Sequence, residues 1–132
     1  MTYPVLTACY GAILGLIFVA LSAWVIAGRG EFKVMNADGG VDALHRRIRA
    51  HANFAEYVPL ALLLIALLEA SGAGRPTLHG LLLALVLARL AHPVGMVAGD
   101  GSMAQRVGRG AGAMATFLVL IITAVLLLVR LL

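Results

Sequence analysis

Residues 5–27 read VLTACYGAILGLIFVALSAWVIA, a run of 23 residues without a formal charge. At about 1.5 Å per residue, a helix of this length crosses a hydrocarbon core of about 30 Å. The residues before the run carry no basic side chain, and no small-residue cleavage site follows it. We therefore expect a spanning helix that the mature chain retains, not a cleaved signal peptide.

The whole chain has the composition of a membrane protein. Of its 132 residues, 62% are hydrophobic and 12% are charged, whereas soluble domains are about 45–50% apolar and about 25% charged. This composition excludes a soluble enzyme. The net charge of +4 comes from basic residues that lie between the apolar runs, which indicates membrane orientation and not nucleic-acid binding. The single cysteine, Cys9, lies inside the first run, so we expect neither a disulfide nor a cysteine-rich metal site.

Three more helices follow the first along the chain. Apolar patterning places the four helices at about residues 5–27, 44–70, 77–98 and 104–130. Short connections rich in Gly, Asp, Ser and Pro separate them and leave no room for a second domain. The sequence therefore predicts one all-α domain over residues 1–132, an integral membrane four-helix bundle.

Basic residues are distributed unequally between the connections. Seven belong to the first and third connections and the helix starts beside them, and two to the second connection and the C-terminus. The seven are Arg29, Lys33, Arg46, Arg47, Arg49, Arg106 and Arg109, and the two are Arg75 and Arg130. Because cytoplasmic loops carry the excess of Lys and Arg, we expect both termini to be periplasmic.

The start of the second helix carries polar groups at membrane depth. At 100° per residue, Arg49, Asn53 and Glu56 fall within an arc of about 60°, with Tyr57 at its edge and Arg47 about 160° away. Ionisable residues inside a membrane mark a functional site by default. The alternative is a cluster that only joins helices by hydrogen bonds.

Helix three adds Arg89 and His92, one turn apart. No His, Cys or carboxylate spacing suits a metal, so none is expected. Glycine pairs at positions 11 and 15, 95 and 99, and 108 and 112 allow close helix packing.

The surplus of arginine suits a small anion with carboxylates and a thiol, because arginine binds carboxylates bidentately and lowers the pKa of a thiol. Glutathione would use each group: the arginines for carboxylates, Glu56 for the ammonium and Asn53 for a backbone amide.

The run RAHANFAEYVP at residues 49–59 resembles the R-A-x-x-N-x-x-E-Y-x-P signature of the MAPEG family, the membrane-associated proteins of eicosanoid and glutathione metabolism. ARLAH at residues 88–92 is similar to a stretch of its prostaglandin E synthase branch. The resemblance implies a homotrimer with glutathione at each subunit interface, near the cytoplasmic side. It makes the following residues candidate contacts: Arg49, Asn53, Glu56, Tyr57 and His92, with Arg29 or Lys33 from the neighbouring subunit.

The family places its thiol-stabilising arginine near Arg106, which is the predicted catalytic residue, while Arg109 could line the same pocket. Several eukaryotic members present tyrosines where this chain has Met96 and Gly110. The leading prediction is a glutathione-dependent transferase or peroxidase that acts on lipophilic electrophiles in a bacterial inner membrane. The alternatives are a non-catalytic lipid- or glutathione-binding scaffold and a small drug/proton exporter that uses Glu56, although Arg49 beside it would repel a cation.

Overall fold

The computed structural model describes residues 3–132 and contains four helices long and apolar enough to cross a membrane. Their bounds are α1 (Val5–Phe32), α2 (Asp42–Ala70), α3 (Arg75–Val97) and a fourth helix over Met103–Leu131. The fourth consists of α4 (Met103–Gln105), the π-helical segment η1 (Arg106–Ala111) and α5 (Gly112–Leu131). Residues 3–132 contain no strand, which confirms the predicted all-α class with four spans; the homotrimer stays a prediction.

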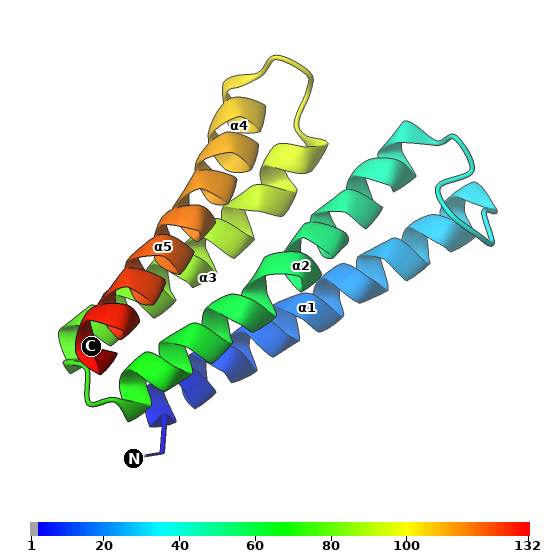
Figure 1. The fold of residues 1–132 in the computed structure, drawn as a ribbon. Coiled ribbons are helices and arrows are strands. Elements are labelled where there is room, and N and C mark those ends of the chain that lie inside the picture. The colour runs from blue at the N-terminus through cyan, green and yellow to red at the C-terminus, as the bar shows by residue number, and fades with distance from the viewer. Residues whose placement is uncertain (1–2) are drawn as a thin grey trace.

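The helices form two antiparallel hairpins, α1 with α2 and α3 with α4–α5 (Figure 1). Both termini lie at one end of the bundle, which we call the terminal end. The connections at 33–41 and 98–102 lie at the other end, the arginine-rich end, where the two hairpins diverge. The first helix extends past residue 27 to Phe32, and Lys33 ends it in a left-handed conformation with φ 55°.

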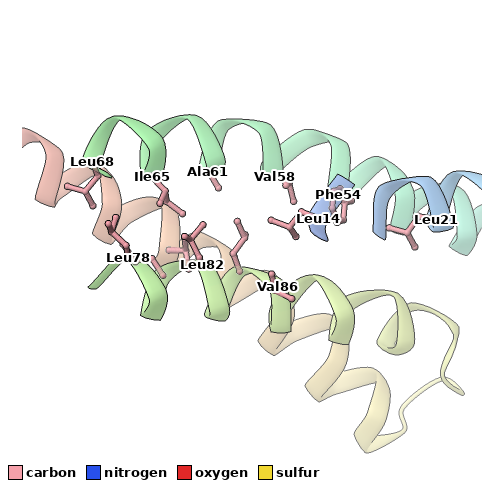
Figure 2. Close-up of a cluster of buried hydrophobic side chains, with 13 residues drawn as sticks. Leu14, Leu21, Phe54, Val58, Ala61, Ile65, Leu68, Leu78, Leu82 and Val86 are labelled. Carbon is pink, nitrogen blue, oxygen red and sulfur yellow. The ribbon is translucent and has the colours of Figure 1, made fainter. Parts of the chain in front are cut away.

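The core lies where α2 faces α3, with α1 and α5 contributing from the sides (Figure 2). The buried apolar side chains that α2 contributes to this core are Phe54, Val58, Ala61, Ile65 and Leu68. Their alternating spacing of four and three residues keeps one stripe of the helix turned to its neighbours. Large apolar side chains elsewhere on all four helices are exposed, as a bilayer environment requires.

Glycines bring the fourth helix close to α3. A Cβ at Gly108 would lie 2.7 Å from Cα of Gly95 and 2.8 Å from the carbonyl oxygen of Ala91, and one at Gly112 would lie 3.0 Å from the carbonyl oxygen of Ala88. The predicted packing role of Gly95, Gly108 and Gly112 is therefore confirmed. At Gly15 and Gly99 an added Cβ meets nothing within 4 Å, so the packing role predicted for these two was wrong for contacts within the subunit.

Candidate functional site

A pocket of about 430 Å³ lies at the arginine-rich end, where α2 and α3 diverge. Residues of both hairpins and of the connection at 98–102 line it. The lining residues are His45, Arg46, Arg49, Asn53, His92, Met96, Asp100, Gln105, Arg109 and Ala113. Four of the predicted contacts, Arg49, Asn53, His92 and Arg109, are among them.

The charge of this pocket is strongly positive. Arg46, Arg49 and Arg109 line it together with a single carboxylate, that of Asp100. The field therefore favours an anionic ligand, because each guanidinium presents a rigid fork of donors that matches a carboxylate.

Arg89 lies beneath the pocket with a relative exposure of 1%. Its guanidinium donates hydrogen bonds of 2.6 Å to Oδ1 of Asn53, 2.9 Å to the carbonyl oxygen of Gly112 and 2.6 Å to Oγ1 of Thr116. All three acceptors are neutral, and within residues 3–132 its Nε has no partner. Arg89 thus joins α2, α3 and α5 and fixes the amide of Asn53, whose oxygen faces the guanidinium and whose NH₂ group remains for a ligand.

The polar face of α2 forms as predicted at its start. Nη1 of Arg49 lies 3.5 Å from Oε1 of Glu56, with both side chains about half exposed, which confirms that they share one face. Glu56 and Tyr57 do not line the pocket. Tyr57 instead packs edge-on against Phe117 of α5, with ring centroids 5.3 Å apart.

Arg47 points away from the pocket, as the helical angles predicted. It pairs with Glu31 at 2.8 Å, and its guanidinium lies 5.4 Å from the ring centroids of Trp24 and Phe32. These contacts anchor α2 to α1 and explain why a basic residue two positions before Arg49 has a different environment.

Three predicted basic contacts lie outside the pocket of their own chain. Arg29 donates a 3.1 Å hydrogen bond to the carbonyl oxygen of Met35, and Lys33 is exposed at the end of α1. Arg106 is exposed at the first position of η1, whereas Arg109, three residues later, reaches the pocket. The roles predicted for Arg29, Lys33 and Arg106 stay predictions.

Sequence reasoning missed Arg46, Asp100 and Gln105 as pocket residues. Arg46 precedes Arg49 by three residues, so the helical periodicity could have found it. Asp100 belongs to a connection and Gln105 to a short helix. No pattern in the sequence indicates that these segments approach α2. The hydrogen bond from Arg46, followed by that from Gln105, holds the pKa of the Asp100 carboxyl below its usual range.

Residues 7–129 match the sequence profile of the MAPEG family. The chain belongs to the MAPEG family. Among curated relatives, the inner membrane protein YecN of Escherichia coli strain K12 is 33% identical over 89 residues, which cover 67% of this chain and 68% of YecN. YecN of strain CFT073 (O6:H1) matches with the same identity and coverage. With four spanning-capable helices, this MAPEG protein is a multi-pass membrane protein.

Proposed function

We propose that this MAPEG protein binds glutathione in the 430 Å³ pocket and acts as a glutathione-dependent transferase or peroxidase on lipophilic electrophiles of the bacterial inner membrane. The observation that carries the proposal is the set of three arginines, Arg46, Arg49 and Arg109, which face one pocket with a single acidic residue. The name of the relative YecN supports the choice of membrane.

The residues present fit the chemical groups of glutathione. Arginine side chains of α2 would bind its carboxylates, and the free NH₂ group of Asn53 would donate to a peptide carbonyl. Glu56, 3.5 Å from Arg49, would accept the ammonium at the edge of the site. Arg89 would act by holding Asn53, through the 2.6 Å hydrogen bond described above.

Bound there, glutathione would supply a nucleophilic thiolate. Arginine remains charged at physiological pH, so one that faces the sulfur lowers the pKa of the thiol. The sequence favours Arg106 for this role, whereas the pocket lining favours Arg109. We therefore assign thiolate stabilisation to Arg109 and keep Arg106 as the comparison.

The proposal includes the assembly and orientation that the family resemblance implies. In a homotrimer, the exposed apolar faces of the helices would be shared between neighbouring subunits and lipid. Arg29 or Lys33 of a neighbour would then complete the site. The basic bias favours an orientation with the pocket on the cytoplasmic side and both termini in the periplasm.

Equilibrium dialysis of detergent-purified protein against labelled glutathione tests the proposal. Arg49→Ala should weaken binding about 100-fold, because a carboxylate deprived of a bidentate partner loses several kcal/mol. Arg47→Ala is the matched control, since Arg47 contacts Glu31 on the opposite face. Equal effects of the two substitutions, or no binding by the native protein, would overturn the proposal.

A non-catalytic glutathione- or lipid-binding scaffold is the second candidate. It is favoured by Met96, an apolar residue that lines the pocket where several eukaryotic family members present a tyrosine. A scaffold would bind glutathione without raising thiolate absorbance. The exporter alternative is disfavoured, because Glu56 is paired with Arg49 and a cation would have to replace a permanently charged guanidinium.

A further inference from the structure

Arg46 of α2 is bound by the connection on the opposite side of the pocket. Its Nη2 donates to both carboxylate oxygens of Asp100 at 2.9 Å each, and its Nη1 donates to the carbonyl oxygen of Ala98 at 3.4 Å. These bonds cross from one hairpin to the other at the arginine-rich end. They tie α2 to the connection between α3 and α4.

The connection is built to present this carboxylate. Nε2 of Gln105 donates to Oδ1 of Asp100 at 2.9 Å, and the backbone N–H of Gly101 donates to Oε1 of Gln105 at 2.7 Å. Gly101 has φ +76°, a conformation that favours glycine. Oγ of Ser102 accepts from the backbone N–H of Gln105 and so begins the next helix. We call residues 98–105 the strap.

The geometry at Arg46 is that of a filled carboxylate site. The arginine side chain is 29% exposed and the Asp100 side chain 74%, so the guanidinium is recessed and the carboxylate covers it from outside. Arg46, Asp100 and Gln105 all line the pocket. A carboxylate that enters the pocket therefore meets an arginine whose Nη2 already donates to Asp100.

We propose that a ligand carboxylate displaces Asp100 from Arg46, and that the strap opens as the ligand enters. Arg46 is then a specificity-determining residue for carboxylates. Asp100 competes with the ligand, because its carboxylate occupies the position on Arg46 that the ligand carboxylate would take. The inference rests on the proposed function in taking glutathione as the physiological ligand, but the exchange itself requires only a carboxylate.

Two observations favour displacement over a permanent tie. The Arg46–Asp100 pair is largely exposed on the carboxylate side, and exposed ion pairs contribute only about 0.2–1 kcal/mol. Residues 98–102 of the strap form a turn, in which the backbone N–H of Ser102 donates to the carbonyl oxygen of Gly99 at 3.0 Å, whereas residues 103–105 are the first turn of the fourth helix. A ligand carboxylate can thus replace Asp100 at small cost, while Asp100 remains free to bind water.

The proposal predicts how a substitution of Asp100 changes the affinity for glutathione. Asp100→Asn removes the competing charge and should tighten glutathione binding by a factor between about 1.4 and about 5, which is what 0.2–1 kcal/mol represents. Glu31→Gln is the matched control, because it removes an exposed carboxylate from the Arg47 pair, outside the pocket. It should leave the affinity unchanged.

Opening of the strap can be measured without glutathione. Nitroxide labels at Ala43→Cys and Gly99→Cys, in a Cys9→Ser background, report the distance between α2 and the strap by electron paramagnetic resonance; an added Cβ at Gly99 meets nothing within 4 Å. Asp100→Asn should lengthen and broaden this distance without ligand. Gln105→Ala, which removes one of the partners of Asp100, should do so more weakly.

Succinate is the simple carboxylate probe. It should lengthen the distance in otherwise native protein and have no further effect in Arg46→Gln, whose strap is already released. A distance that neither succinate nor Asp100→Asn alters would overturn the inference. If glutathione fails to bind while succinate opens the strap, the proposed function fails and the inference stands. If glutathione binds while the strap stays closed, the proposed function stands and the inference fails.

Discussion

The guanidinium of Arg89 donates a 2.6 Å hydrogen bond to Oδ1 of Asn53, and the two residues lie 36 positions apart in the chain. The bond connects a buried cation of α3 with a pocket residue of α2. Because it uses the oxygen of the amide, it also determines which group of Asn53 a ligand can meet. This contact thus joins α2 to α3 and orients the amide of Asn53 in the site.

Thr116→Val should lower the stability of the bundle more than Thr123→Val. Both threonines are buried on α5 and donate to the carbonyl oxygen four residues earlier, but only Thr116 also accepts a hydrogen bond from Arg89. Loss of a hydrogen bond to a charged group costs about 1.5–3 kcal/mol. Thermal unfolding in detergent measures the difference, and equal midpoints for the two variants would contradict the role assigned to Arg89.

Gly108→Ala should prevent correct packing of the fourth helix. The added Cβ would lie 2.7 Å from Cα of Gly95 and 2.8 Å from the carbonyl oxygen of Ala91, both backbone atoms that cannot rotate away. Gly110→Ala, two residues later, meets nothing within 4 Å and serves as the control. The yield of monodisperse protein in size-exclusion chromatography should fall severalfold for the first variant alone. Normal yield and stability of Gly108→Ala would show that α3 and η1 pack less closely.

Arg109→Leu should abolish the rise in ultraviolet thiolate absorbance that native protein produces with glutathione. The reason is that Arg109 lines the pocket, whereas Arg106 does not. Binding should remain within about tenfold of native, because the α2 contacts persist. Arg106→Leu should keep the signal. The opposite result would return the catalytic role to Arg106, and binding without any signal in native protein would favour the scaffold.

The strap should remain closed at every pH from 8 to 5. The pKa of Asp100 is lowered by the hydrogen bonds from Arg46 and Gln105, so the interaction is present above the unfolded aspartate pKa of about 3.9 and is lost as the pH falls through the lower folded value. Arg46, Arg49 and Arg109 remain charged throughout. The nitroxide distance should therefore lengthen only below about pH 3.9. Opening between pH 8 and pH 5 would contradict the role assigned to the Arg46–Asp100 pair.

Cysteines introduced at Asp38 and Asp100 should react with a membrane-impermeant reagent only from the cytoplasmic side, and a cysteine at Gly74 only from the periplasm. The seven-to-two basic bias predicts this orientation, and the two aspartates belong to the connections 33–41 and 98–102. A Cys9→Ser background removes the native thiol, which is exposed. Labelling at position 38 from the periplasm of intact cells would reverse the topology and remove the pocket from cytoplasmic glutathione.

The sequence by itself determined the helices and the polar face of α2. Apolar runs of about bilayer length predict helices, because a helix satisfies its own backbone hydrogen bonds inside lipid. Fixed rotation per residue then placed Arg49 beside Glu56 and turned Arg47 away, as the contacts confirm. The glycines at 108 and 112 also predicted a close approach of two helices, because residues without a large side chain let two backbones come near each other.

Only the tertiary structure decided which of these groups meet in one pocket. The partners of Arg89 come from α2 and α5, and Arg46 meets a carboxylate 54 positions later in the chain. Which arginine of the fourth helix reaches the pocket depends on the π-helical turn at 106–111, which alters the rotation that α-helical periodicity assumes. Such pairings follow from how two hairpins diverge and how closely α3 approaches η1, and these distances are set by packing across the whole bundle.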